Sequence, residues 1–149
     1  MAERYLRSIR LLAECYQAFE RLSQDNLRRR TGLTPAQFDI IATLGNTNGM
    51  TFKELGEKTL ITKGTLTGVV DRLESRGLVV RIAHMEDRRR TIVRLTGTGE
   101  QEFNRVFSPQ IAHCKLPFEN YNEKDFDALE AALEKLHAHL SSPKKHIKR

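Results

Sequence analysis

The chain of 149 residues has no tryptophan, two cysteines, four prolines and no long apolar run. No stretch approaches the roughly 20 apolar residues of a membrane-spanning helix. The opening segment, MAERYLRSIR, spreads its charges and lacks the apolar core of a secretory signal. Cys15 and Cys114 lie far apart and form no CxxC pair, as is usual in the reducing cytosol. We therefore expect a cytoplasmic protein that is neither a membrane protein nor a disulfide scaffold.

Signatures of catalysis and of metal binding are also missing. The sequence contains no GxSxG elbow and no GxGxxG or GxxxxGK[ST] phosphate loop. The five histidines form no i, i+4 pair on one helix face, which is a common zinc-binding arrangement. We expect no catalytic residue, no metal site and no cofactor, so an enzyme is disfavoured.

Positive charge is present in excess and is unevenly distributed. The net charge is +6, and residues 51–96 carry ten basic and six acidic side chains. Residues 97–140 carry four basic and eight acidic side chains, whereas the tail 141–149 carries four basic ones and no acidic one. A basic middle beside an acidic segment favours a polyanion-binding module on a separate scaffold, followed by a disordered basic tail.

Long amphipathic segments lie at both ends of the chain. An apolar stripe predicts a first helix over 3–28, and its members are Tyr5, Ile9, Leu12, Tyr16 and Phe19. A last helix over 123–140 carries a two-heptad seam from Phe126 to Leu140. Between them, a helix over 100–116 contains Pro109, which is expected to kink or split it. These segments expose more apolar surface than one short chain can cover, and they predict a homodimer built by residues 1–30 and 100–140.

Capping residues place three short helices in the middle of the chain. Thr34 followed by Pro35 predicts one helix start, and Thr51 with Glu54 predicts another, over 52–58. Thr62 is the candidate cap of a helix over 62–76, and the stretch 45–50 reads as a loop. After Gly77 the apolar period changes from 3.6 to 2, which predicts strands over 78–83 and 91–96 around a polar connection.

Three short helices followed by a β-hairpin form a winged helix-turn-helix, here over 34–98 within a single domain of 1–149. The fold class is therefore mainly α with a small β-hairpin (α+β). Helix 62–76 is expected in the major groove of DNA and the wing 84–91 at the minor groove or phosphates. Gly68 costs a helix about 1 kcal/mol relative to alanine, so it needs a reason such as close approach to DNA. The candidate DNA contacts are Thr62, Lys63, Gly64, Thr65, Thr67, Gly68, Arg72, Asp87, Arg88, Arg89 and Arg90.

The run from Leu66 to Val79 and the wing motif Asp87-x-Arg89 followed by Leu95-Thr96 closely resemble the MarR family of bacterial regulators. The resemblance extends over essentially the whole chain. It implies that Thr62 to Thr67 face the major groove and that Arg72 reaches a phosphate. It further implies that Arg89 enters the minor groove, held by a salt bridge from Asp87. Gly68 departs from the family pattern, because many members have arginine there.

The same resemblance implies an effector pocket between the dimerisation and DNA-binding lobes, often for aromatic or phenolic anions. Tyr16, Phe19, Phe38 and Ile111 are its candidate lining, although each also fits plain core. The expected function is a homodimeric repressor that binds a roughly palindromic operator and is released by a small aromatic or phenolic effector. Two alternatives remain, a winged-helix module that binds protein and a thiol-based oxidant sensor. Cys15 lies beside the apolar stripe and is expected to pack as an inert thiol.

Overall fold

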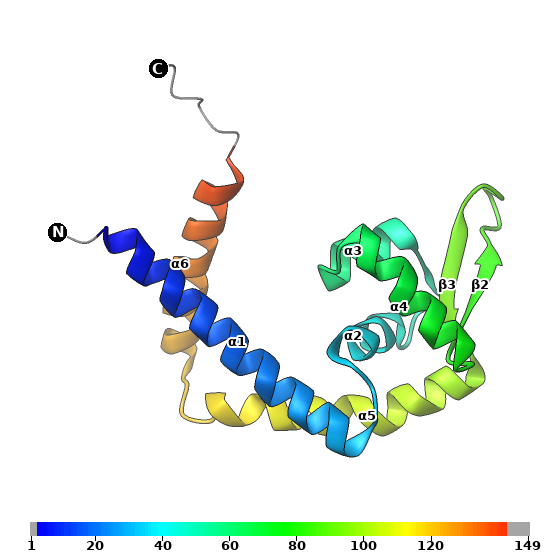
Figure 1. Ribbon diagram of the computed structural model, residues 1–149, viewed down its shortest axis with the longest axis horizontal. Helices are drawn as coiled ribbons and strands as arrows, with labels where there is room; N and C mark the ends of the chain where they lie inside the picture. The colour runs from blue at the N-terminus through cyan, green and yellow to red at the C-terminus, as the bar shows by residue number, and fades with distance from the viewer. Residues whose placement is uncertain (1–2, 143–149) are drawn as a thin grey trace. The chain divides into compact units, whose positions relative to one another are not determined.

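The computed structural model describes residues 3–142 (Figure 1). Residues up to Cys114 form one compact unit and those from Lys115 form a second. The first unit contains α1 (Arg4–Arg30), α2 (Pro35–Leu44), β1 (Met50–Thr51), α3 (Phe52–Thr59), α4 (Lys63–Ser75), β2 (Val79–Ala83), β3 (Thr91–Leu95) and α5 (Gly97–Lys115), whose last residue begins the second unit. The second continues with a 3-10 turn (Leu116–Phe118) and α6 (Glu123–Ser141). The expected basic tail, apart from Ser141 and Ser142, lies outside the described residues.

The predicted caps start the predicted helices. The Thr34 hydroxyl accepts a bond from the Gln37 amide at 3.2 Å, and the Gln37 side chain accepts one from the Thr34 amide at 3.1 Å. The Thr51 hydroxyl accepts a bond from the Glu54 amide at 3.2 Å. Thr62 also precedes its helix, but its hydroxyl donates to the Thr65 hydroxyl at 3.2 Å instead of capping a backbone amide. That hydroxyl pair lies on the exposed start of α4.

The sheet has three antiparallel strands in the order β1-β3-β2, one more than the expected hairpin. Met50, expected in a loop, pairs with Val93, and Thr51 pairs with Ile92. Two residues carry no periodicity, so the sequence pattern could not reveal this strand. Gly49 makes the approach possible at φ +106°, because a Cβ there would lie 2.8 Å from the Val93 carbonyl oxygen.

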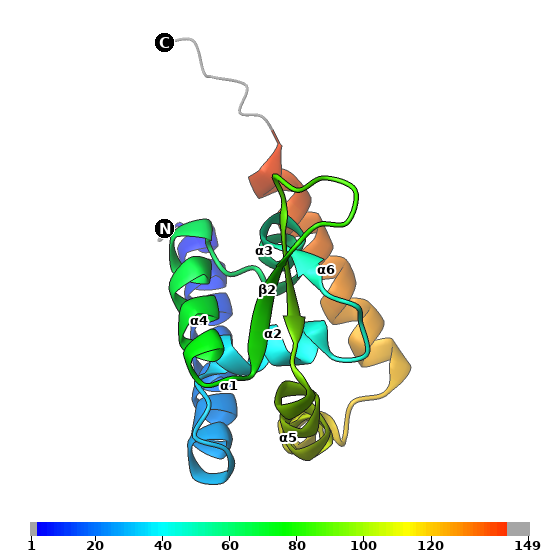
Figure 2. The same cartoon turned by 90° about the vertical axis from the view of Figure 1, so that its right-hand side faces the viewer.

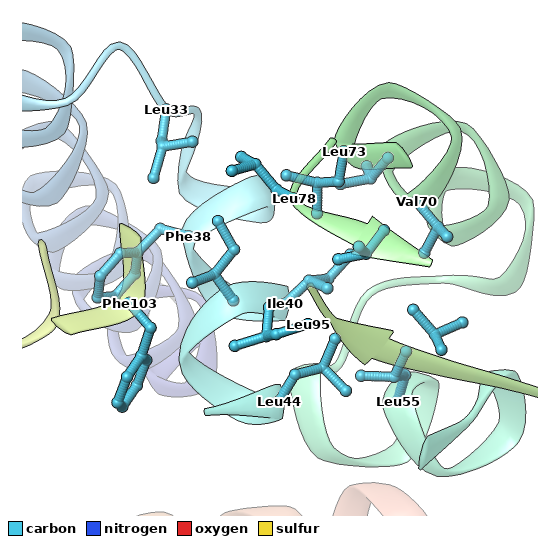
Figure 3. Close-up of a cluster of buried hydrophobic side chains, with 14 of the residues drawn as sticks. Leu33, Phe38, Ile40, Leu44, Leu55, Val70, Leu73, Leu78, Leu95 and Phe103 are labelled. Atoms are coloured by element: carbon cyan, nitrogen blue, oxygen red, sulfur yellow. The ribbon is translucent and has the colours of Figure 1, made fainter. Parts of the chain in front are cut away.

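A continuous apolar core holds α4 and the sheet against α2 and α3 (Figure 3). Its fully buried members come from α1, α2, α3, α4 and both hairpin strands, and they are Leu27, Ile40, Ile41, Leu44, Leu55, Leu66, Val70, Leu73, Val79 and Val93. Each such side chain contributes about 1.5–3 kcal/mol relative to an exposed one. The core therefore fixes the position of α4 and of the base of the hairpin.

Pro109 does not split α5, which was one of its two expected effects: the helix runs without a break from Gly97 to Lys115. Packing on either side of the proline stabilises the continuous helix. Phe107, two residues before it, stacks on Phe103 with ring centroids 4.9 Å apart. Gln110, one residue after it, is buried and accepts a 2.5 Å bond from the Asn26 side chain of α1. The Gln110 amide nitrogen donates in turn to the Ser23 carbonyl and hydroxyl at 3.1 and 3.0 Å. These contacts offset the single backbone bond that proline removes.

The second unit is built on an aromatic cluster and one long helix. Phe118, Tyr121 and Phe126 form the cluster, with centroid separations of 5.3–6.0 Å. Asn122 caps α6 by accepting a bond from the Asp125 amide at 2.9 Å. The leucine seam of α6 is uncovered in the single chain, since Leu133 is 39% exposed and Leu140 is 67% exposed. Among the described residues, no helix is long and apolar enough to cross a membrane.

Candidate nucleic-acid interface

Helix α4 divides cleanly into a core side and a solvent side. Leu66, Val69, Val70 and Leu73 are buried. The solvent side exposes two threonines and two cations, Thr65, Thr67, Lys63 and Arg72. The acidic Asp71 and Glu74 are exposed toward its C-terminal end. Because the core fixes the buried side, the exposed side is presented as a rigid ridge.

No contact among the described residues requires glycine at the two glycine positions of α4. A Cβ built on Gly64 or Gly68 would meet nothing within 4 Å. By contrast, a Cβ on Gly99 would lie 2.0 Å from the Leu78 carbonyl oxygen. Gly64 and Gly68 stand one helical turn apart, so they leave the backbone of one stripe of α4 open to close approach from outside.

A hollow of about 770 Å³ lies between α3 and α4. Phe52, Ile61 and Leu66 supply apolar lining. Lys53, Lys63 and Arg81 supply positive charge, against one acidic side chain, Glu57. Lys53 was not among the sequence candidates, although its place one residue into a capped helix puts a cation beside the start of α4. The positive side of the helix pair is therefore wider than α4 alone.

The wing is the connection between β2 and β3, residues 84–90, and it forms the end of the hairpin remote from α5 (Figures 1 and 2). Every side chain from Met85 to Arg90 is exposed. None of the ion pairs formed by the described residues involves Arg88, Arg89 or Arg90. Three free guanidinium groups therefore gather at one tip.

Asp87 does not hold Arg89 by a salt bridge, and that expectation was wrong. The Asp87 carboxylate instead accepts a bond from the Arg89 backbone amide at 3.1 Å. The Asp87 carbonyl accepts a second bond, from the Arg90 amide at 2.9 Å. Aspartate commonly bonds to backbone two residues onward, and this local bond competes with a side-chain partner. Asp87 shapes the turn and leaves the Arg89 side chain free.

Arg81 of β2 joins the hairpin to α4 and α3. Its guanidinium bonds the Asp71 carboxylate, and its Nε lies 3.7 Å from the Glu74 carboxylate. The same group lies over the Phe52 ring, 5.4 Å from the centroid. Arg81 was not among the sequence candidates, because a basic residue in a short strand resembles an ordinary solvent-facing position.

A second hollow, of about 580 Å³, lies between α1, the start of α2 and the turn after α3. Of the four candidate effector residues, Tyr16 and Phe19 line it. Phe38 is buried and stacks on Phe107, with centroids 6.4 Å apart, and Ile111 is absent from the lining. Tyr16, Phe19 and Ile111 are all exposed in the single chain, so they do not belong to its hydrophobic core as the alternative expectation had it. Spacing alone could not show that most of the α1 stripe has no neighbour within its own chain.

The charge of this second hollow is negative. Glu20 and Asp39 line it, together with no basic side chain. Partial burial, with Glu20 nearby, raises the pKa of Asp39. A hydrogen bond to Glu20 raises the pKa of Tyr16. These carboxylates disfavour an aromatic anion, which was the expected effector class.

The two cysteines occupy different surroundings. Cys15 is exposed in the single chain, so its expected apolar packing is not present there. Cys114 is partly buried, and the Gln110 amide nitrogen lies 3.5 Å from its sulfur. Burial raises the pKa of Cys114, which disfavours the reactive thiolate.

The helices α2, α3 and α4 followed by a β-hairpin define a winged helix-turn-helix protein. Its helix α4 has an exposed, open backbone, and the tip of its hairpin is cationic. A sequence profile of the MarR family matches residues 31–90. An uncharacterized HTH-type transcriptional regulator from Bacillus cereus is 32% identical over 136 residues, covering 91% of this chain and 87% of that protein. The chain belongs to the MarR family of DNA-binding transcriptional regulators.

Solved structures share the fold over nearly the whole chain. Sco3205 from Streptomyces coelicolor, a MarR family regulator solved in complex with DNA, has a TM-score of 0.82 at 22% identity. That match covers 97% of this chain and 91% of the other. BpsR from Bordetella bronchiseptica, whose DNA binding is regulated by 6-hydroxynicotinic acid, has a TM-score of 0.71 at 26% identity and covers 86% and 91%. These likenesses bear out the expected fold class.

Proposed function

We propose that this protein is a homodimeric repressor that binds a roughly palindromic operator through α4 in the major groove and the wing in the minor groove. The exposed side of α4 carries the proposal, because it combines hydroxyls, a cation and an open glycine backbone on a helix fixed by the core. The three free arginines of the wing supply the second contact. The DNA complex of Sco3205, which shares the fold, supports this reading.

A second copy of the chain is the proposed partner of the uncovered helices. Along α1, the residues Tyr5, Leu6, Ile9, Leu11, Leu12, Tyr16 and Phe19 are exposed, and α6 adds its leucine seam. Contiguous apolar surface of this kind marks an interface. Residues 1–30 and 100–140 would then form the dimer, and 34–98 the DNA-reading lobe.

The dimer is tested by sedimentation of the full chain at micromolar concentration. A species twice the 17.1 kDa chain mass is expected. Leu133→Asp should dissociate or unfold it, because the variant would bury a carboxylate without a partner. Glu134→Gln on the same helix is the matched control and should leave the dimer intact. A monomeric wild-type protein would contradict the proposal.

Operator binding is tested by selection from random duplexes. A two-fold dimer presents two identical helices, so the selected site should be symmetric, with half-sites about 10 bp apart. Lys63, Thr65 and Thr67 are the proposed base readers. Enrichment of no symmetric site, together with weak retention on heparin, would instead favour a module that binds protein.

Arg89 is the proposed minor-groove residue of the wing. Arginine in a narrow minor groove gains from concentrated negative potential, whereas one at a phosphate makes a screened contact. Arg89→Ala should therefore weaken operator binding by about 1–3 kcal/mol, the usual range for a specific contact. Arg88→Ala and Arg90→Ala, measured by fluorescence anisotropy, should cost less and affect operator and scrambled duplex equally. A larger and more selective loss at either neighbour would overturn this assignment.

Release by a small aromatic or phenolic effector is the proposed regulation, and the second hollow is its proposed site. Regulation of BpsR by 6-hydroxynicotinic acid, in a protein of the same fold, supports regulation by an aromatic effector, although the negative lining of this hollow favours an effector without an acid group. Because Glu20 and Asp39 line the hollow, neutral phenols and aromatic amines should raise the melting temperature more than aromatic acids do. Asp39→Asn should reduce the preference for the amines. A screen in which only aromatic acids stabilise the protein would exclude this site.

A further inference from the structure

The wing is closed by a histidine side chain that none of the DNA contacts proposed above uses. His84 is the first residue beyond the Ala83–Thr91 strand pair, and its amide donates to the Arg90 carbonyl at 2.9 Å. Its ring nitrogen Nδ1 accepts two bonds, from the amides of Glu86 and Asp87, each at 3.1 Å. The ring is half-buried, whereas Met85 beside it is 96% exposed.

These two bonds require a particular chemical form of the ring. A ring nitrogen that accepts hydrogen bonds carries no proton, so the imidazole is neutral with its proton on Nε2. In the charged ring both nitrogens are donors. A proton on Nδ1 would then face two backbone N–H groups, and both contacts would be replaced by repulsion.

The rest of the turn is held by Asp87, whose own amide is bonded to the His84 ring. The Asp87 carbonyl and carboxylate accept the amides of Arg90 and Arg89. The His84 ring thus fixes the backbone of Asp87, and Asp87 fixes the backbone of Arg89. The exposed connection has no core to hold it, so these side-chain bonds and its two backbone bonds hold its conformation.

We propose that His84 is a positioning residue of the wing: its neutral ring holds the turn that presents Arg89, and operator affinity falls when the ring becomes charged. The proposal rests on the proposed DNA binding by this wing.

A charged His84 also has an opposite electrostatic effect. It adds a cation near the polyanion and would strengthen binding to any duplex. The other titratable and charged residues of the hairpin are Glu86, Asp87, Arg88, Arg89 and Arg90 of the connection, and Arg81 and Arg94 on the strands. Loss of the turn affects sequence-selective binding, whereas added charge acts equally on all duplexes. The ratio of operator affinity to scrambled-duplex affinity therefore isolates the proposed effect.

The binding experiment measures this ratio between pH 8 and pH 5.5 for three variants. His84→Asn places a side-chain oxygen where Nδ1 lies and cannot titrate, so its ratio should stay near the wild-type pH 8 value throughout. His84→Ala has no acceptor and should be low throughout. The wild-type ratio should fall by about tenfold, as expected for two lost hydrogen bonds. His113→Asn on α5 is the control and should keep the wild-type profile.

A second measurement needs no DNA. Long-range nitrogen–proton NMR of the free wild-type protein should show His84 protonated on Nε2 at pH 8. The amide resonances of Glu86 and Asp87 should shift with the same midpoint as the ring. A proton on Nδ1 at pH 8, or amides that do not follow the ring, would overturn the proposal whatever the binding results.

The two measurements separate the two levels of the proposal. If the NMR result is as expected but no duplex is bound selectively at any pH, the proposed DNA binding fails while the histidine cap stands. If operator binding is selective and its ratio is flat with pH in the wild type, the positioning role of His84 is refuted.

Discussion

Replacing Arg81 by methionine should loosen α4 from the hairpin, because one guanidinium connects both to α3. Methionine keeps much of the apolar stem and removes the charge. The pair with Asp71 is partly exposed, at 30% for the Arg81 side chain and 57% for the Asp71 side chain. At that exposure an ion pair contributes about 0.5–1 kcal/mol, and the cation–π contact with Phe52 adds about 0.5–1 kcal/mol. We expect Arg81→Met to lower the free energy of unfolding by about 1–2 kcal/mol.

Urea unfolding of a double-mutant cycle separates the ion pair from the ring contact. Asp71→Asn removes one partner, and the Asp71–Arg81 coupling energy should be about 0.5–1 kcal/mol and should shrink in high salt. Arg81→Lys should recover only part of the loss, since an ammonium lacks the planar fork that reaches a carboxylate and covers a ring. A coupling below about 0.3 kcal/mol, the usual limit of additivity, would refute a role for the ion pair.

For three further substitutions the direction of the change in stability can be predicted. Gly99→Ala should destabilise strongly in thermal unfolding, because its Cβ would collide with the Leu78 carbonyl oxygen. Gly68→Ala should stabilise the free protein by up to about 1 kcal/mol, since the added Cβ meets no other atom. The same substitution should weaken operator binding measured by fluorescence anisotropy. Stronger binding would show that DNA does not approach the backbone at this position. Asp39→Asn should raise stability at neutral pH, because burial and Glu20 raise the pKa of Asp39. That gain should vanish as pH falls below the ordinary carboxyl range, where the wild-type Asp39 is itself protonated.

Local signals in the sequence predicted most of the fold. Thr34 and Thr51 marked helix starts because their hydroxyls bond to amides three residues away, an interaction that needs no distant partner. β1 could not be predicted, since two residues carry no period and its pairing with β3 spans more than forty residues. Spacing could not show that α5 stays continuous through Pro109, because that depends on the packing of Phe107 and Gln110.

In the candidate interface, too, features set by local spacing could be predicted, whereas features set by contacts in the folded chain could not. The exposed side of α4 could be predicted from helical spacing, since the buried positions fix which side remains. The salt bridge expected from Asp87 could not be judged from spacing, because the Arg89 amide competes for the same carboxylate. The roles of His84 and Arg81 depend on contacts that only the folded turn and sheet create.

The start of α5 is bound closely to the residues that follow α4, so a tilt of α5 would be passed to α4. The Thr96 hydroxyl donates to the Gly77 carbonyl at 2.6 Å and accepts from the Gly99 amide at 3.0 Å, while Gly99 sits against Leu78. A 19-residue helix is about 28 Å long, at 1.5 Å per residue. A tilt of α5 by about 10° about its start would displace its far end by about 5 Å. That displacement exceeds the roughly 3.4 Å step between base pairs. If the chain binds a palindromic operator as a dimer, as proposed above, an effector that imposed only a small tilt would put the two α4 helices out of register with their half-sites.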